Sequence, residues 1–343
     1  MKIPGWKDKI LFTPGPLTTS QTVKQAQLYD LGSRDHAFIE KVRHIRRALV
    51  TLGGVSTPEY TAIPMQGSGT FGLEAALGTS MPREGKLLVA VNGAYGQRMA
   101  AMAEMMGIAV ERLDFREDTP VSAAEVAARL QADPDIKVVS ACHCETTTGI
   151  MNPVQAIGAA VQEAGRLFLV DAMSTFGAVP LALDTAGIDY LVSSANKCIE
   201  GVPGFSFVLA RRTALEQSAG NARSMSLDLL AQYRGLESNG QFRFTPPTHA
   251  LLAFHQALAE LEAEGGVEGR AARYQENHAA LTAGMRALGF ETYLPPETQG
   301  YIITSFYYPD APGFYFETFY DRLNERGSVI YPGKVSGAEL FRV

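Results

Sequence analysis

Apolar segments alternate with helical segments along residues 86–210 of this sequence. We expect strands at 86–91, 109–113, 136–144, 166–170, 190–193 and 205–210. Helices are expected at 35–52, 95–107, 121–132 and 153–164. Strands that are apolar along their whole length are typical of a mostly parallel sheet covered by helices on both faces. The pattern therefore predicts an α/β fold, in which ligands bind at the carboxyl ends of the strands.

A different pattern begins near residue 247. Two long helices are expected there, then a strand, a helix and a strand, at 247–264, 267–288, 301–306, 314–325 and 328–331. Near the other end, two prolines flank Gly15 and predict an extended arm. We therefore divide the chain into an N-terminal arm, a large domain with the parallel sheet and a smaller C-terminal α+β domain, at 1–20, 21–246 and 247–343.

Charge and hydropathy exclude several classes of function. The 343 residues carry a formal net charge of −6, so the sequence lacks the positive surface typical of proteins that bind nucleic acid or an anionic membrane. No apolar run approaches the length of a membrane span, and Met1–Lys9 lacks the apolar core of a signal peptide. We expect a cytoplasmic protein that acts on small molecules.

The cysteines predict neither disulfides nor a metal site. Cys142, Cys144 and Cys198 are an odd and sparse set, which forms no disulfide framework. The Cys142-His143-Cys144 stretch lacks the second pair of ligands that a zinc site needs. We interpret these cysteines as buried structural thiols.

Two neighbouring strands are each followed by a charged residue. Asp171 ends the apolar run 166–170, and Lys197 follows 190–192 among small residues. Such a pair suggests a pyridoxal phosphate site, where the lysine forms a Schiff base and the acid partners the protonated pyridine nitrogen. The alternative is that Asp171 is a helix cap or turn former and Lys197 a solvated surface charge.

A glycine-rich turn runs into a helix at residues 66–75. Helix N-termini bind phosphate readily, because their first N–H groups lack partners and the dipole is positive there. Gly67, Gly69 and Gly72 also have the spacing of a dinucleotide fingerprint, but the segment before them contains Pro64 and predicts a poor first strand. Nicotinamide, flavin, phosphate and simple turn interpretations all remain open.

Two further stretches follow strand ends. Tyr95 lies just past a strand, where its ring can cover a flat ligand or pack into the loop. Residues 145–149 present a row of hydroxyls that suits a phenolate oxygen or caps the helix at 153. His143, just before them, is interpreted as a hydrogen-bonded strand histidine and not as an acid–base catalyst.

Together these motifs resemble the class V branch of the fold-type I pyridoxal-phosphate-dependent aminotransferases, over nearly the whole chain. The resemblance is carried by residues 11–19, 67–70, 92–98, 143–150, 171–177, 194–198, 243–247, 331–334 and 341–342. Within that branch, residues 143–149 and 196–201 are most similar to enzymes that move the amino group of 2-aminoethylphosphonate to pyruvate. The implied products are phosphonoacetaldehyde and L-alanine, formed in a ping-pong cycle during phosphonate degradation.

The resemblance implies a role for each matching residue. Lys197 would bind the cofactor covalently and carry the proton, and Asp171 would pair with the pyridine nitrogen. Tyr95 would stack on the ring and Thr146 would bond the ring oxygen. The phosphate would be held by Ser68, Gly69, Thr70 and Asn196.

The substrate and the assembly follow in the same way. Arg342 and Gly15 would bind the substrate, the arginine through its acidic group. Thr245 would reach the phosphate of the neighbouring subunit, which implies a homodimer with shared active sites.

One departure from the family pattern leaves alternatives open. The family usually has tryptophan after Gly32-Ser33, whereas here Arg34 follows, and an extra cation near the substrate entry would tune specificity. The alternatives within the family are an alanine– or serine–glyoxylate transaminase and a lyase that releases ammonia from a hydroxylated aminophosphonate. From another class, a nicotinamide dehydrogenase would use Gly67–Gly72 as its fingerprint.

Overall fold

The computed structural model describes residues 8–343. Most of the Met1–Lys9 segment, on which the signal-peptide interpretation depends, lies outside the described residues, as does the first part of the predicted arm. No helix in the described part of the chain combines the length and hydropathy needed to cross a membrane.

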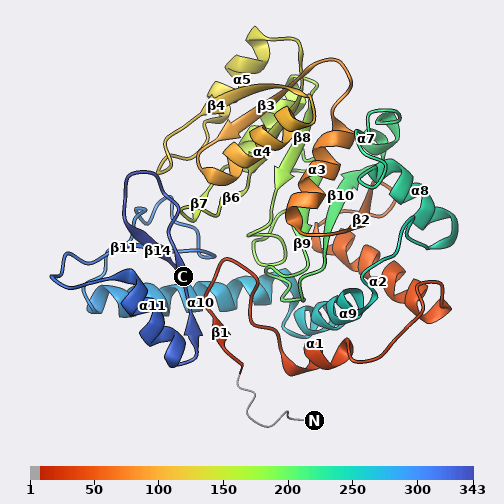
Figure 1. Ribbon diagram of the computed structural model, residues 1–343. Coiled ribbons are helices and arrows are strands. Elements are labelled where there is room, and N and C mark those ends of the chain that lie inside the picture. Colours follow the sequence, from red (N-terminus) through yellow and green to blue (C-terminus); the bar gives the residue numbers. More distant parts are fainter. Residues whose placement is uncertain (1–7) are drawn as a thin grey trace.

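A seven-stranded sheet forms the centre of the molecule, in the order β2-β10-β9-β8-β5-β3-β4 (Figure 1). Its strands are β2 Tyr60–Gln66, β3 Lys86–Val91, β4 Ala109–Asp114, β5 Ile136–Cys142, β8 Leu167–Asp171, β9 Tyr190–Ser194 and β10 Phe205–Arg211. The five strands from β9 to β4 run parallel, and β10 is antiparallel to both of its neighbours. The predicted α/β fold with a mostly parallel sheet is therefore confirmed.

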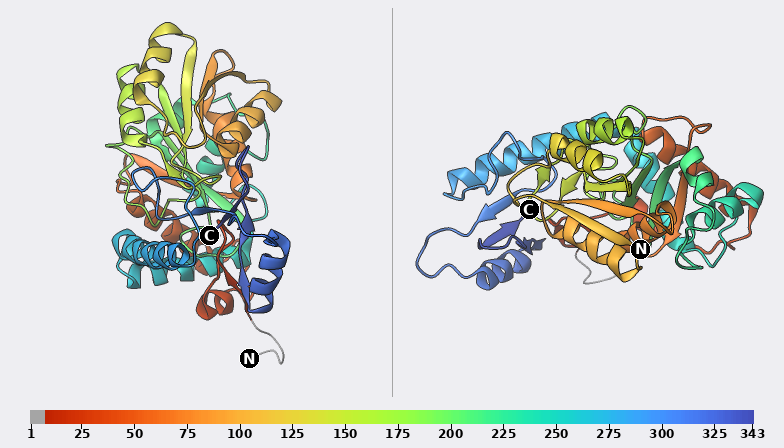
Figure 2. Two further views of the ribbon diagram at one scale, coloured as in Figure 1. Left: turned by 90° about the vertical axis from the view of Figure 1, so that its left-hand side faces the viewer. Right: turned by 90° about the horizontal axis from the view of Figure 1, so that it is seen from above.

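Helices cover both faces of this sheet (Figure 2). They include α3 Gly69–Ser80, α4 Ala94–Met105, α5 Ala123–Ala132 and α6 Val154–Glu163. α3 packs on β8, β9 and β10, α4 packs on β3, β4 and β5, and α6 packs on β8 and α5. α5 begins two residues after its predicted start, where the Ser122 hydroxyl accepts the Glu125 N–H, and Pro153 is the residue before α6.

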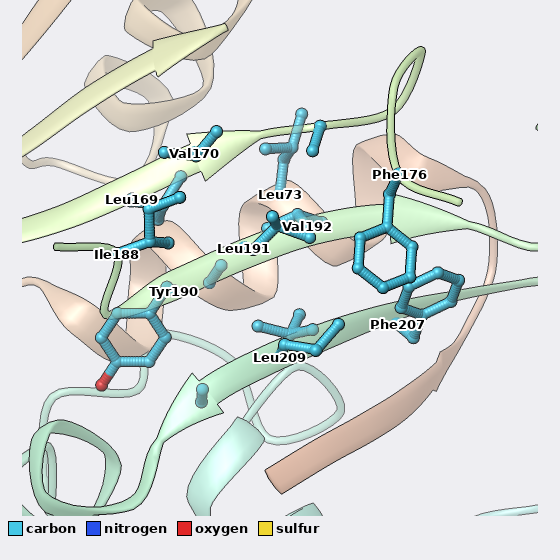
Figure 3. Packing of buried hydrophobic residues seen from close by; sticks show 14 of the residues in the cluster. Leu73, Leu169, Val170, Phe176, Ile188, Tyr190, Leu191, Val192, Phe207 and Leu209 are labelled. Atoms are coloured by element: carbon cyan, nitrogen blue, oxygen red, sulfur yellow. The ribbon is translucent and has the colours of Figure 1, made fainter. Parts of the chain in front are cut away.

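Side chains are buried on both faces of six of these strands, which explains why those strands are largely apolar, whereas the edge strand β4 is mostly exposed or half-buried. Leu191 and Val192 of β9 pack with Leu73 of α3 (Figure 3). Beyond them, the rings of Phe176 and Phe207 meet edge to face with centroids 5.4 Å apart. This core fixes the strand ends that carry the candidate site.

One prediction about the sheet is wrong. Residues 60–65 were expected to be a poor strand because they contain Pro64, but β2 spans Tyr60–Gln66. β2 is the edge strand, and Pro64 lies opposite Phe207 of β10. An edge strand needs hydrogen bonds on one side only, so a residue without an N–H is tolerated there.

The remaining elements lie around this sheet. The helices are α1 Gln21–Ala26, α2 His36–Leu52, α7 Arg212–Gln217, α8 Leu229–Asn239, α9 Thr248–Ala263, α10 Gly266–Ala287 and α11 Phe316–Glu325. The short strands are β1 Ile10–Leu11, β6 Cys144–Glu145, β7 Ile150–Met151, β11 Ser305–Tyr307, β12 Ser328–Val329, β13 Tyr331–Pro332 and β14 Leu340–Arg342. α9 packs on α1 and α2 and contributes to the main apolar core.

The C-terminal residues form a small sheet of their own, in the order β11-β14-β13. Its core is the buried trio Phe306, Ile330 and Phe341, against which α10 and α11 pack aromatic and aliphatic side chains. β1 of the N-terminal arm pairs in parallel with β12, so residues 10–11 lie beside residues 328–329 of the C-terminal part. In Figure 1, β1 lies below the main sheet. The expected strand at 301–306 is shorter, and the expected strand at 328–331 is split into β12 and β13. The domain boundaries at residues 20 and 246 stay a prediction.

Candidate active site

The carboxyl ends of β5, β8 and β9 bring Asp171 and Lys197 to the same edge of the sheet. Asp171 is the last residue of β8 and lies opposite Cys142 of β5 and Val192 of β9. Lys197 follows β9 in the next loop, and the two side chains act on each other electrostatically: each charge favours the charged form of the other. The acid and the lysine therefore share one site.

The Asp171 carboxyl is almost completely buried. Its Oδ1 accepts the Met173 N–H at 2.9 Å, and within residues 8–343 no side chain donates a hydrogen bond to it. Burial raises the pKa of Asp171 to about 6. A buried carboxyl with a main-chain donor alone can accommodate a further cation.

The Lys197 side chain is partly buried, and this burial lowers the pKa of its amine. Nζ donates to the main-chain oxygen of Pro14 at 2.8 Å, so the N-terminal arm reaches the site. Gly15 lies directly against the amine, because a Cβ at that position would be 2.6 Å from Nζ. The φ angle of Gly15 is +124°, which also favours glycine. The structure thus brings Gly15 and Lys197 together.

The N-terminus of α3 lies beside the same strand ends. Gly69 is in close contact with Met173, since a Cβ there would be 2.5 Å from the Met173 sulfur. Ser68 is the N-cap residue of α3, and its hydroxyl makes no capping hydrogen bond. The first N–H groups of a helix have no partner within the helix, so Ser68, Gly69 and Thr70 offer donors to an anion. Asn196, next to Lys197, accepts the Ser194 hydroxyl at 3.1 Å.

Tyr95 is the second residue of α4, and its ring has the Arg98 guanidinium 4.8 Å from the centroid. Glu145, for which the sequence predicted no role of its own, holds this helix start. Fully buried Glu145 accepts the N–H groups of Tyr95 and Gly96, both at 3.3 Å. A carboxylate at a helix N-terminus is favourable. Glu145 directly precedes the three threonines at 146–148, so the sequence already places it beside a strand end.

Arg342 lies far away in sequence but enters the site from β14. It is 3% exposed, and Nη1 donates to the main-chain oxygen of Thr146 at 2.9 Å while Nε donates to that of Pro332 at 3.1 Å. Burial lowers the pKa of Arg342, and a hydrogen bond with Tyr95 opposes this shift. The Thr146 hydroxyl is 2.7 Å from that of Ser174. The structure therefore joins Arg342, Thr146 and Tyr95.

Thr245 is exposed and lies in the segment before α9. Its main-chain oxygen accepts a hydrogen bond from Gln66 at the end of β2, at 3.0 Å. Thr245 and Arg34 line the same shallow cavity of about 360 Å³. Within the described residues, no hydrogen bond connects Thr245 with Lys197 or Asp171.

His143 and the three cysteines are buried, and the contacts of His143 are with the protein itself. The His143 Nδ1 is 2.9 Å from the Thr175 hydroxyl, and burial lowers the pKa of His143 to about 4. His143 is hydrogen-bonded, as predicted, but it lies between β5 and β6 and not within a strand. Its lowered pKa makes it neutral at pH 7. Cys142, Cys144 and Cys198 are buried and free.

A family model, described as aminotransferase class-V, matches residues 7–330. This chain belongs to the class V aminotransferases. The family is pyridoxal-phosphate-dependent, as the motifs implied, and the dehydrogenase interpretation of Gly67–Gly72 is therefore wrong.

Curated class V relatives cover almost the whole chain. A 2-aminoethylphosphonate–pyruvate transaminase of Syntrophobacter fumaroxidans is 54% identical over 97% of this chain and 90% of the relative. The protein of the same name from Salmonella typhimurium is 50% identical over 98% of this chain and 92% of the relative.

Solved structures of aminotransferases share the fold. An alanine–glyoxylate aminotransferase from Nostoc superposes with a TM-score of 0.90 at 25% identity, covering 100% of this chain and 92% of that one. A ureidoglycine–glyoxylate aminotransferase from Bacillus subtilis has a TM-score of 0.89 at 24% identity, covering 98% of this chain and 87% of that one. The second likeness establishes the fold alone.

Proposed function

We propose that this aminotransferase moves the amino group of 2-aminoethylphosphonate to pyruvate and forms phosphonoacetaldehyde and L-alanine. The observation that carries the choice of substrates is the 50–54% identity, over nearly the full length, with relatives that bear this name. A role in phosphonate degradation and a cytoplasmic location follow from the same proposal.

The residues at the strand ends fit pyridoxal 5′-phosphate. A protonated ring nitrogen beside Asp171 would supply the cation that this buried carboxyl lacks, and would favour its charged form. The lowered pKa of Lys197 favours the neutral, nucleophilic amine that binds an aldehyde. We infer that the cofactor is held by Ser68, Gly69, Thr70, Tyr95, Thr146, Asp171, Asn196 and Lys197.

Lys197 is the residue that we propose as the acid–base catalyst. When bound, pyridoxal phosphate carries the amino group between the substrates and stabilises the negative charge left as a C–H bond breaks. Lys197 Nζ would take the proton from the substrate carbon that bears the amino group and deliver it to C4′, the carbon of the cofactor that receives the amino group. The hydrogen bond to the Pro14 oxygen orients Nζ, and the missing side chain of Gly15 leaves room beside it.

Arg342 is proposed to bind the acidic group of each substrate. A guanidinium forms paired hydrogen bonds with a phosphonate or a carboxylate, so one residue serves 2-aminoethylphosphonate and pyruvate in turn. Its bonds to the Thr146 and Pro332 oxygens fix the plane of the guanidinium before a substrate arrives. Burial strengthens the attraction by excluding water.

We further infer a homodimer with shared active sites. Thr245 is exposed in the single chain, and Gln66 holds its segment beside the end of β2. Exposure of a residue with this expected role is consistent with a Thr245 that acts in the neighbouring subunit. Arg34 lies in the same cavity, so it would adjoin the partner's substrate.

The test is a coupled assay for phosphonoacetaldehyde with purified enzyme, 2-aminoethylphosphonate and pyruvate. We expect product in step with L-alanine, and none from Lys197→Ala. If the enzyme used L-alanine and glyoxylate but not 2-aminoethylphosphonate, the proposed substrates would be wrong and the aminotransferase activity would stand. Ammonia released from a hydroxylated aminophosphonate without a keto acid would indicate a lyase.

A further inference from the structure

Four charged side chains form a network behind the lysine loop, which we call the Glu200 network: Glu200, Glu264, Arg270 and Arg273. Arg270 of α10 is one of the largest fully buried side chains, and its Nε donates to Glu264 at 2.7 Å. Arg273 donates to Glu264 at 2.6 Å and to Glu200 at 2.9 Å. Arg270 Nη1 lies 3.6 Å from Glu200, which closes the network. Each arginine therefore contacts both acids.

The Glu200 network is bonded to the main chain that carries Lys197. Arg270 Nη1 donates to the main-chain oxygen of Cys198, the residue after the lysine. The Glu200 N–H donates to the main-chain oxygen of Lys197 at 2.6 Å and closes a tight turn over residues 197–200. The buried guanidinium and Glu200 thus hold the turn at its second and fourth residues.

Glu200 has an unusual backbone. Its φ is +63°, and no other non-glycine residue within 8–343 has a positive φ. Left-handed backbone is unfavourable for a residue with a Cβ, and glycine would fit this position with less strain. The Glu200 carboxylate pairs with Arg270 and Arg273. We interpret these ion pairs as the reason why a glutamate occupies this strained backbone position.

We propose that the Glu200 network positions Lys197, by fixing the turn from which the lysine side chain extends. The inference rests on the proposed function, in which the amine of Lys197 moves a proton. Its four-carbon chain is flexible, so Nζ stays in place only if the main chain and the Pro14 oxygen hold both ends. Proton transfer requires a reach of about 3 Å, and a small displacement has a large effect on rate. Glu200, Arg270 and Arg273 are positioning residues.

The hydrogen bonds of the Glu200 network also determine the pKa of Glu264. Burial raises the pKa of Glu264, but the hydrogen bonds from Arg273 and Arg270 outweigh burial, and the net shift is downward. Its lowered pKa keeps Glu264 ionised at neutral pH, and the same hydrogen bonds raise the pKa of Arg273. Removing the fully buried Arg270 would leave a cavity and would deprive the Cys198 oxygen of its donor, which endangers folding. Glu200, whose side chain is a quarter exposed, is the safer site to change.

The first test measures the amine without any turnover. The pKa of Lys197 in cofactor-free protein is read from the pH dependence of its reaction with trinitrobenzenesulfonate, followed on the Lys197 peptide by mass spectrometry. We expect Glu200→Gln to raise this pKa toward 10.5, because a less restrained amine reaches water. A purely electrostatic effect would lower the pKa, since the substitution removes a negative charge. Glu276→Gln, the same change at an exposed position of α10, should leave it unchanged.

The second test measures proton transfer with L-alanine, so it does not depend on the phosphonate. Exchange of the alanine α-proton in heavy water is followed by NMR, per cofactor-loaded subunit. Glu200→Gln should slow exchange about tenfold to a hundredfold, with the alanine concentration for half-maximal rate nearly unchanged. Glu200→Gly, which suits the backbone, should be slowed as well.

Two results would overturn the proposal. One is a normal Lys197 pKa together with normal exchange in both Glu200 variants. The other is a lower unfolding temperature of a Glu200 variant together with an unchanged exchange rate at 25 °C. That result would indicate that Glu200 has a purely structural role. If the wild type exchanges alanine but does not use 2-aminoethylphosphonate, the proposed substrate fails and the comparison of variants still decides this inference.

Discussion

The Asp171 carboxyl shows, at the scale of a residue, how burial at a strand end changes the acidity of a side chain. The apolar residues of β8 bury the strand, and the acid at its end is buried with it. Burial raises the pKa of Asp171 to about 6 because water no longer stabilises the charge. The buried charge of Asp171 therefore lowers the free energy of unfolding of the cofactor-free protein at neutral pH. A cation beside the carboxylate would offset this loss.

We predict that Asp171→Asn stabilises the cofactor-free protein at pH 8. The pKa is about 6 in the folded protein and 3.8 ordinarily, so between these values the folded state binds more protons and its stability falls as pH rises. The shift corresponds to about 3 kcal/mol at most. Thermal unfolding should show a higher midpoint for the variant at pH 8 and little difference at pH 4. A larger gain at pH 4 than at pH 8 would contradict this.

Some residues of the site were within reach of sequence reasoning and others were not. Asp171 ends a predicted strand and Lys197 follows another, so the rule for parallel sheets predicts where they meet. Arg342 had no such signal, because its position depends on how a separate C-terminal sheet docks on Thr146. The residue roles derived from the family resemblance stay predictions until they are tested.

At the scale of an element, periodicity predicted most helices and strands to within a few residues. It failed at β2, because the sequence does not show that this strand lies at an edge of the sheet, where Pro64 is tolerated. It also gave no sign of how closely α6 packs. A Cβ on Gly158 would be 1.9 Å from the main-chain oxygen of Ala186, so only a glycine lets the helix approach.

We predict that Gly158→Ala lowers the free energy of unfolding by about 2–3 kcal/mol, because a main-chain atom cannot move aside as a side chain can. Gly284→Ala is the matched control on α10, where a Cβ would have no atom within 4 Å. It should be neutral or stabilising by up to about 1 kcal/mol, since alanine favours a helix. Urea denaturation measures both. Equal effects of the two substitutions would refute the close packing of α6.

At the scale of the whole molecule, two apolar cores support one site. The large core holds the strand ends, and the small core around Phe306 and Phe341 holds β14 with Arg342. The Phe341 ring stacks on Phe306 at 5.6 Å, directly beside Arg342 in sequence. A site assembled from both cores needs the small one intact even while the large one stays folded.

We therefore predict that Phe341→Leu separates loss of activity from global unfolding. The smaller side chain weakens the small core and leaves the large core unchanged. In a urea series, transamination should disappear at a lower concentration than the main circular dichroism transition, and the gap should exceed that of the wild type. Coincident loss of both signals in the variant would show that the two cores unfold as one.

The central claim is that Lys197 and Asp171 hold one pyridoxal phosphate between them. Borohydride reduction of the purified enzyme, followed by peptide mass spectrometry, tests it most directly. We predict one reduced cofactor per subunit, attached to the peptide that contains Lys197, and weaker cofactor retention in Asp171→Asn. Attachment to a different lysine, or no attachment in an active enzyme, would contradict the account.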